Sequence, residues 1–521
     1  MKNKKRKRDP KYKQLSFETA IRNPERYKGI LEYMQDYQGI VLNDENLLTI
    51  VSGMYENGIV TSPDFDLSKY STKEEIYNSV ISINSTRKAD GGFPKGYQSR
   101  FWTYMRTLSE FGFVYARYNK PFKIGDVGLK FIENKIDAQE AFSIQAIKYN
   151  RRSPYKNVLN DFNYFRFIIK VLKKLDSENK KLSYNQFIIS LFSEDGNVDE
   201  FIKIIKNNKF PTPDSVYSYL EKIYGKINKK STVLGDYPDV VLRMLRITGF
   251  VNILNKGITL IELNQRNLNY INSLLKLDYK LTKKEKNVDI AYFNKINQIT
   301  RNEMLLIEKN RKEVFHIVDY NVVLSKIIEE NNVTKEELLE DIQNLCFTKK
   351  RNEKFKYIDE PLQFEFYISL LVYLIYGNEY SVNPNYKTDD YGMPISHAPG
   401  KTGDIEVLGP GKYWLLEVTL IRNKTQQINN ETVNLFRHID NSKWEEKYMS
   451  LIAPVVHEDT VRLYNSLVIE YLIEKRDKFY AKPYDINEFI ESCKVKNNFE
   501  DMIIYTKKLK EKALTELMQE I

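Results

Sequence analysis

The amino-acid sequence predicts a multidomain α+β protein with a mainly helical N-terminal half and a C-terminal α/β domain. Its 521 residues are too many for one core, since domains usually hold roughly 100–200 residues. Helical periodicity begins at Ser16, whereas after Arg351 an apolar helix is followed by strands and turns. We therefore predict a basic flexible tail over 1–15, subdomains over 16–140 and 141–265, a helical linker over 266–350 and the α/β domain over 351–521.

Composition argues against membrane and disulfide-rich classes. Hydrophobic residues make up 42% of the chain, and no apolar run reaches the ~18–20 residues that span a bilayer. The basic N-terminus is not followed by the apolar segment of a secretory signal. Cys346 and Cys493 are far apart and the chain has four histidines, which argues against a disulfide framework or a structural zinc cluster. We expect a cytoplasmic protein without a membrane partner.

The charge favours a polyanionic partner. The net charge is +10, and the excess is spread along the chain. Nucleic acid is the first candidate, and the basic run Lys2–Arg8 would contact phosphates. The alternative is a solvated basic surface without such a partner. In that case the abundance of lysine would reflect only an AT-rich genome.

The first subdomain has the element order of a winged helix, a common DNA-reading module. A helix over Lys73–Ile83, a glycine-containing loop over Lys88–Gly96 and a helix over Ser99–Phe111 come first. Two short strands follow, over Phe113–Tyr118 and Pro121–Ile124, and then a helix over Asp126–Glu133.

Part of this pattern recurs in the second subdomain. Arg106 and Arg243 each lie six residues before a Gly-Phe-Val sequence, and strand-like residues follow both. We predict two winged-helix-like subdomains, with a chance similarity as the alternative. In the linker, Thr334 and Glu337 have the spacing of a capping box.

A predicted hairpin carries the first candidate chemistry. Asp404–Leu408 and Tyr413–Leu420 read as strands joined by a turn. If Leu408 faces Tyr413, Asp404 lies opposite Glu417 on the same face, with Cβ atoms roughly 4.5–5.5 Å apart. Two carboxylates at that separation suit Mg²⁺. The alternatives are a shifted register or a solvated hairpin with two unrelated acids.

Two further helices carry polar residues that bear on this hairpin. Glu365 lies in Pro361–Tyr376, a helix that is apolar nearly all round, so its carboxylate is expected to be buried and paired or metal-bound. Otherwise it reaches solvent from the first turn. In the helix near Thr425–Ile439, Glu431 and His438 share one edge, which in isolation is also typical of a plain helix surface. Residues 399–403 resemble a phosphate-binding loop but precede a strand, so we reject nucleotide binding and expect the glycines to let DNA approach Asp404.

Together these residues resemble the catalytic domain of AlwI-type type IIS restriction endonucleases, which include single-strand nicking relatives and belong to the PD-(D/E)XK nuclease superfamily. The resemblance rests on the order and spacing of Glu365, Asp404, Glu417-Val418, Glu431 and His438. More loosely, residues 97–103 and 124–128 are similar to the family's recognition domain. The resemblance implies a bacterial protein and a nuclease domain with a mixed central sheet.

The implied reaction is Mg²⁺-dependent hydrolysis of a DNA phosphodiester that leaves a 5′-phosphate. The resemblance makes Asp404, Glu417, Glu365 and the Val418 carbonyl the metal ligands. Thr419 stands where many superfamily members have a lysine, so Glu431 and His438 become the candidates for activating water.

The N-terminal half would find a short asymmetric site on double-stranded DNA, a few base pairs from the cut. Base contacts are expected from Gln98, Arg100, Thr103 and Arg106, and phosphate contacts from Lys88 and Lys95. Double-strand cleavage would need a transient homodimer or a small second subunit, and a cognate DNA methyltransferase would complete the restriction–modification system.

Two other functional classes remain as alternatives. The chain could be a nicking endonuclease, as the large subunit of a heterodimer, or a winged-helix DNA-binding protein without catalysis. A DNA methyltransferase ranks last, because the chain has neither a glycine-rich cofactor motif after a strand nor an Asn-Pro-Pro-Tyr-like motif.

Overall fold

The computed structural model divides the chain into two compact units, residues 1–315 and 316–521. It describes residues 11–60, 62, 65–70, 72–83, 96–314, 319–348, 350, 352–398, 402–422, 427–428, 436, 439, 444–475 and 478–519. The unit boundary falls inside the predicted linker. Helices over the first part of that linker belong to the first unit, and helices over the rest belong to the second.

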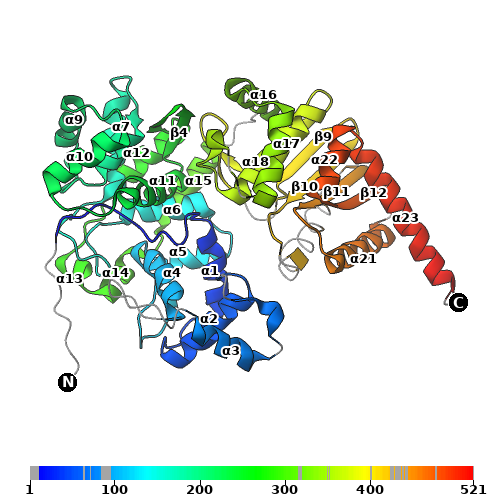
Figure 1. The fold of residues 1–521 in the computed structure, drawn as a ribbon, viewed down its shortest axis with the longest axis horizontal. Helices are drawn as coiled ribbons and strands as arrows, with labels where there is room; N and C mark the ends of the chain where they lie inside the picture. Colours follow the sequence, from blue (N-terminus) through cyan, green and yellow to red (C-terminus); the bar gives the residue numbers. More distant parts are fainter. Residues whose placement is uncertain are drawn as a thin grey trace. The chain divides into compact units, whose positions relative to one another are not determined.

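The first unit is mainly helical, with three short β-pairings (Figure 1). Its elements are α1 (Arg26–Met34), η1 (Gln35–Tyr37), α2 (Asp44–Glu56), η2 (Leu67–Lys69), α3 (Lys73–Ser82), α4 (Gln98–Glu110), β1 (Val114–Tyr115), β2 (Lys123–Ile124), α5 (Asp126–Ile132), α6 (Ala138–Lys148), α7 (Tyr164–Asp176), β3 (Leu182–Ser183), α8 (Tyr184–Ser190), α9 (Val198–Asn207), α10 (Pro213–Tyr224), η3 (Thr232–Asp236), α11 (Tyr237–Ile247), β4 (Val251–Lys256), β5 (Ile258–Leu263), α12 (Leu268–Lys276), α13 (Lys283–Asn287), α14 (Asp289–Ile296) and α15 (Arg301–Val314).

Helix α6 forms the centre of this unit, because all eleven of its residues are buried. Both charged side chains on it are paired. Lys148 forms an ion pair with Glu303 of α15 at 2.8 Å, and both side chains are almost fully buried. Arg311 of α15 also binds Glu140 at 2.6 Å. The residues predicted as the start of a linker therefore help to build the core of the first unit.

The two predicted repeats have the expected elements, and both pack on α6. The first has α3, α4, the antiparallel pair β1–β2 and α5, and the second has α11 and the β4–β5 hairpin. Gly112 and Gly249 follow α4 and α11 in the left-handed region, at φ +73° and +69°. A Cβ on Gly112 would lie 2.5 Å from Cγ1 of Ile296, and one on Gly249 would lie 1.9 Å from Nε2 of Gln139 on α6. Both corners thus require glycine for conformation and for space.

The second unit contains a mixed five-stranded sheet in the order β12-β11-β10-β9-β6. The pairs β10–β11 and β11–β12 are parallel, whereas β9–β10 and β6–β9 are antiparallel. The elements are α16 (Tyr320–Asn331), α17 (Lys335–Gln343), η4 (Asn344–Thr348), η5 (Glu353–Phe355), α18 (Glu360–Tyr376), β6 (Ser381–Pro384), β7 (Lys387–Thr388), β8 (Pro394–Ser396), β9 (Ile405–Gly409), β10 (Lys412–Val418), β11 (Glu446–Ala453), α21 (Glu458–Lys475), β12 (Lys478–Asp485), α22 (Ile486–Lys494) and α23 (Asn498–Gln519).

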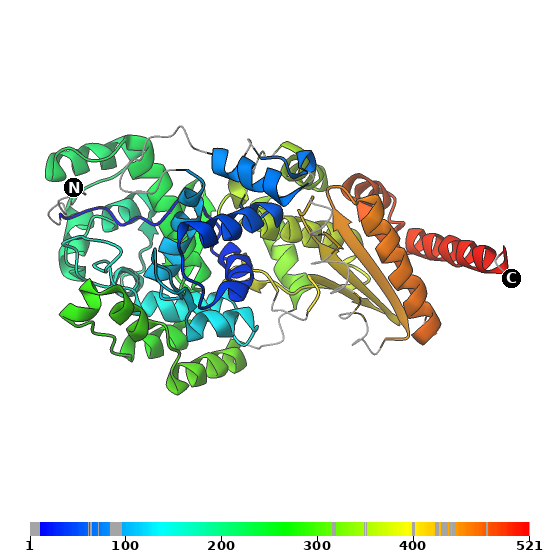
Figure 2. The ribbon, with the colours of Figure 1, turned by 90° about the horizontal axis from the view of Figure 1, so that it is seen from below.

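Helices cover both faces of this sheet (Figure 1). Trp414, Leu416 and Val418 of β10 point to the face covered by α16, α17, α18 and α22. Tyr413 and Leu415 point to the other face, where α21 packs. Figures 1 and 2 both show the last turns of α23 projecting beyond the sheet. None of the helices in the described part of the chain is long and apolar enough to cross a membrane.

The predicted capping box of α17 forms only in part. The Thr334 hydroxyl accepts a hydrogen bond from the Glu337 amide at 3.1 Å, as predicted. The Glu337 side chain instead binds Lys354 at 2.7 Å and Asn352 at 3.1 Å. A lysine that is distant in sequence offers this carboxylate a stronger, charge-assisted bond than the backbone amide of the cap does.

Candidate active site

The hairpin of β9 and β10 has the register that the sequence predicts. Leu408 pairs with Tyr413, and the ladder continues inward to Ile405 and Leu416. Pro410 and Gly411 form the turn between the paired residues Gly409 and Lys412. One step beyond the last pair, the register sets Asp404 opposite Glu417, on the sheet face that carries Tyr413 and Leu415.

A neighbouring backbone amide orients one of the two carboxylates. The Val418 amide donates a hydrogen bond of 2.8 Å to Oδ2 of Asp404. Glu417 is 9% exposed. A Cβ on Gly403 would lie 2.2 Å from Cδ1 of Leu415 and 3.6 Å from Oε2 of Glu417. Gly403 therefore has a role inside the protein, where it lets the chain before Asp404 lie against β10.

Thr419 is the first residue after β10. Its side chain is buried, and its amide donates to the Ile452 carbonyl of β11 at 2.9 Å. Its hydroxyl accepts a hydrogen bond of 3.1 Å from the Ile421 amide. Thr419 thus shapes the chain as it leaves β10 and supplies no cation there.

Glu365 is buried in α18, as the apolar helix predicts, with only 3% of its surface exposed. Its Oε1 contacts Nδ1 of His397, which follows β8. Oε2 is buried and has no hydrogen-bond partner among the described residues. Sequence reasoning missed His397, and the available signal was its rarity, since the chain has only four histidines.

These donors fit a hard divalent cation in chemistry, and the described residues assemble only part of its shell. Asp404 and Glu417 offer carboxylate oxygens from opposed positions, which are ligands that Mg²⁺ prefers. The partnerless oxygen of Glu365 is a further buried acceptor. However, α18 packs on the sheet face opposite to that of Asp404 and Glu417. Within the part of the chain that the structure describes, no three His, Cys, Asp or Glu side chains gather closely enough to hold a metal.

Glu431 and His438, predicted on the helix near 425–439, lie outside the described residues. Two members of the apolar face of that helix are described. Ile439 is fully buried, and the ring of Phe436 lies 5.6 Å from that of Tyr464 on α21. Both belong to the core on the sheet face of Asp404 and Glu417.

The predicted DNA-reading residues on α4 differ in their surroundings. Arg100 is exposed and forms no ion pair with the described residues. Gln98 donates to Asp44 at 2.8 Å, and the Thr103 hydroxyl donates to the Ser99 carbonyl at 2.8 Å. Arg106 binds Glu18 at 2.9 Å. Lys88 and Lys95 lie outside the described residues.

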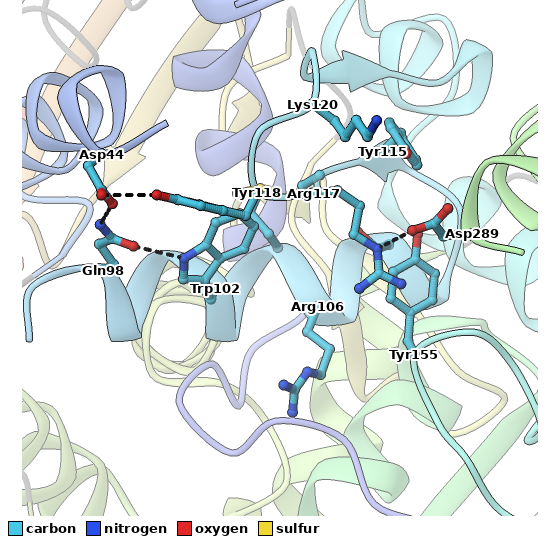
Figure 3. A pocket seen from close by; sticks show the side chains of 13 residues that line it. Asp44, Gln98, Trp102, Arg106, Tyr115, Arg117, Tyr118, Lys120, Tyr155 and Asp289 are labelled. Carbon is cyan, nitrogen blue, oxygen red and sulfur yellow. Dashed lines mark hydrogen bonds and ion pairs between the residues drawn. The ribbon is translucent and has the colours of Figure 1, made fainter. Parts of the chain in front are cut away.

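Gln98 and Arg106 also line a cavity of about 710 Å³ between α4 and the segment after β1 (Figure 3). On α4, Met105 and Leu108 are buried, whereas Trp102 is half-buried and faces this cavity.

Comparison with known proteins gives one extensive match. The family model described as AlwI restriction endonuclease matches residues 109–304 and 281–492, which together cover more than half of the chain. Among solved structures, the chain is similar to the small subunit of the heterodimeric restriction endonuclease R.BspD6I, with 19% identity and a TM-score of 0.25. That similarity covers 36% of this chain and 90% of the subunit. No curated protein sequence matches the chain.

Proposed function

The chain belongs to the AlwI restriction endonuclease family, and on that premise we propose that it is a type IIS enzyme. Membership makes it a site-specific nuclease that binds DNA. In our proposal it recognises a short asymmetric site on double-stranded DNA and hydrolyses phosphodiester bonds a few base pairs outside it. The product would carry a 5′-phosphate.

The register of the β9–β10 hairpin is the observation that carries this proposal. It sets Asp404 and Glu417 opposite each other at the end of a paired ladder, where two like charges repel unless a cation lies between them. The hydrogen bond from the Val418 amide orients the Asp404 carboxylate. The repulsion between the two carboxylates would destabilise the sheet, and a cation bound between them would offset that repulsion.

We propose that Asp404 and Glu417 hold Mg²⁺, with the Val418 carbonyl and Glu365 as further ligands. Bound there, Mg²⁺ would polarise the scissile phosphate and lower the pKa of a water. Glu365 would be oriented by His397, because the two side chains are in contact. Glu431 and His438 remain our candidates for the group that orients or deprotonates the attacking water, since Thr419 cannot do so.

The first unit would supply recognition, with Arg100 as the base-contacting residue on α4. Its guanidinium is exposed and has no ion pair with the described part of the chain, so it is available for the two acceptors of a guanine edge. Gln98 and Arg106 already bind acidic side chains, so we assign them to the cavity they line. Lys88 and Lys95, which lie outside the described residues, stay proposed phosphate contacts, and Thr103 stays a proposed base contact.

Cleavage of a single strand is the second candidate activity. The chain carries one Asp404–Glu417 hairpin, and one such site cuts one strand per event. Cleavage of both strands would require a transient homodimer or a small second subunit. A cognate DNA methyltransferase would protect the host.

The deciding experiment is digestion of plasmid DNA with the full chain, with and without Mg²⁺, followed by sequencing of the cut ends. We expect Mg²⁺-dependent breaks or nicks at a fixed offset from a short common sequence. Absence of any cleavage at every enzyme concentration would overturn the proposal. The ends also distinguish nicking from double-strand cleavage and identify the recognition sequence.

A further inference from the structure

The cavity beside α4 has no role in the hydrolysis proposed above. Its volume of about 710 Å³ lies within the ~300–1,000 Å³ typical of small-ligand pockets. One wall is a single face of α4, and the other is the chain from Tyr115 to Lys120 (Figure 3). Asp44, Tyr155 and Asp289 complete it. All of these residues belong to the first unit.

Four of the thirteen residues that line the cavity are aromatic, and hydrogen bonds hold two of them. The Trp102 indole donates to Oε1 of Gln98 at 3.3 Å. The Tyr118 hydroxyl donates to Oδ2 of Asp44 at 2.9 Å, although the ring itself is 48% exposed at the mouth. Tyr115 and Tyr155 lie at the other end. Rings that are fixed in this way offer flat faces on which a planar heterocycle stacks at little entropic cost.

Asp44 and Gln98 give one end of the cavity a hydrogen-bonding edge. Asp44 accepts from both Gln98 and Tyr118, and Gln98 accepts from Trp102, so the four side chains form one chain of bonds (Figure 3). The Gln98 amide nitrogen also donates to the Tyr97 hydroxyl at 3.2 Å, so Asp44 and Gln98 offer acceptor oxygens to the cavity. The amino and imino groups along a nucleobase edge are donors to such oxygens.

Cations stand at the opposite end. The Arg117 guanidinium lies 4.3 Å from the centre of the Tyr155 ring and is held by Asp289 at 2.6 Å. Lys120 is exposed and forms no ion pair with any residue that the structure describes. Its ammonium group is therefore available for a phosphate, while the aromatic interior is suited to the base that the phosphate carries.

We propose that this cavity receives one nucleobase swung out of the bound duplex, stacked on Trp102 and Tyr118 with its edge toward Asp44 and Gln98. The proposal rests on the proposed function, because it takes DNA as the ligand of the first unit. It goes further by assigning recognition of one position in the site to an extrahelical base. Lys120 would contact the phosphate beside that base.

The test uses the full chain, in EDTA, with duplexes of the sequence found from the cut ends. In each duplex the partner of one base of the site is replaced, so that this base is mismatched and costs less to unpair. We expect a several-fold rise in affinity for the mismatch at one position and none at the others. Trp102→Ala should abolish the rise and weaken DNA binding by roughly 5- to 150-fold, as for loss of one base–aromatic stack. Trp102→Phe should largely restore both.

Trp444→Ala is the matched control, because it removes a partly exposed tryptophan from the second unit and should leave the rise unchanged. Lys120→Ala should weaken binding to every duplex. Band shifts on these duplexes measure the affinities. Binding without a rise in affinity for any mismatched duplex would overturn this proposal alone, whereas failure to bind any duplex would overturn the proposed function as well. If free mononucleotides quench tryptophan fluorescence but no mismatch raises the affinity, the cavity takes a free nucleotide and the extrahelical base is refuted.

Discussion

The hairpin in the second unit and helix α4 in the first both carry residues chosen from sequence for function, yet the fold treats them differently. In the hairpin, spacing along the chain determines geometry, because the register of a tight two-strand turn sets which residues oppose each other. On α4, spacing determines only the helix face. The partners of Gln98 and Arg106 are Asp44 and Glu18, which lie far away in sequence. A local sequence pattern therefore predicts which residues face each other on a hairpin. It does not predict which side chains on a helix face are taken up by partners from elsewhere in the chain.

The largest effect should come from the hairpin. Asp404→Asn and Glu417→Gln keep the shape of each side chain but remove the charge, so cleavage should fall by at least ~10³-fold, as expected when several kcal/mol of transition-state stabilisation is lost. DNA binding in band shifts should change little. Glu406→Gln, on the same strand as Ile405, is the matched control, because Glu406 only accepts a hydrogen bond from Tyr413. Normal cleavage by the Asp404 or Glu417 variant would show that the opposed carboxylates take no part in catalysis.

The next effect concerns stability in the first unit. Gly112→Ala combines a positive φ with overlap on Ile296, and each cost is roughly 1–3 kcal/mol, so the free energy of unfolding should fall by roughly 2–6 kcal/mol. Gly257→Ala has the same sign of φ at +75° but nothing within 4 Å, so it should cost only ~1–3 kcal/mol. Chemical denaturation measures both. Equal losses of unfolding free energy in the two variants would mean that the corner at Gly112 packs more loosely than described.

Arg100 and Arg106 test the comparison on α4 itself. Arg100→Ala should weaken specific binding by ~5- to 150-fold, as for loss of one bidentate base contact, and leave the melting temperature unchanged. Arg106→Ala should instead lower stability by about 1 kcal/mol or less, because its pair with Glu18 is partly exposed. Binding to the cognate and to scrambled duplexes, with thermal melting alongside, separates these outcomes. If Arg106→Ala weakened specific binding and Arg100→Ala lowered stability, Arg106 would be the base-contacting residue.

The smallest effect is a lack of reaction. Burial raises the pKa of both thiols, Cys346 and Cys493, to about 12. Since thiolate is the reactive form, neither should react with iodoacetamide at pH 8 in the folded protein, and both should react once the second unit unfolds. Mass spectrometry along a denaturant series would then report unfolding of this unit alone. Rapid labelling of the native protein would contradict the burial of these cysteines.

Much of the fold could be predicted because its signals are local. The limits of α3, α4 and α18 and the pairing of Leu408 with Tyr413 follow from periodicity, capping and turn residues. The sequence also indicated that Glu365 is buried, since its helix is apolar all round. The contact of Glu365 with His397 was beyond such reasoning, because it joins two elements through tertiary packing.

The same limit explains the misjudged details. Glu337 was expected to complete a capping box, but Lys354 competes for its carboxylate. Residues 266–314 read as a charged linker because their polar side chains are numerous. Two of those charges, on Glu303 and Arg311, are in fact paired with α6. Charge in a sequence indicates solvent exposure only where no partner comes from elsewhere in the fold.

The fully buried helix α6 has a consequence for how specificity can be transplanted between relatives. Its Gln145 donates to the carbonyls of Phe111 and Ile296, and Asn267 donates to the Gly249 carbonyl beside Gln139. A graft of residues 16–140 alone would end inside α6 and separate Gln145 from the Phe111 carbonyl, which would leave polar groups stranded in an apolar interior. The unit that can be exchanged between relatives is therefore residues 11–314 as a whole. A chimera joined after α15 should fold, whereas a chimera joined at residue 140, inside α6, should precipitate.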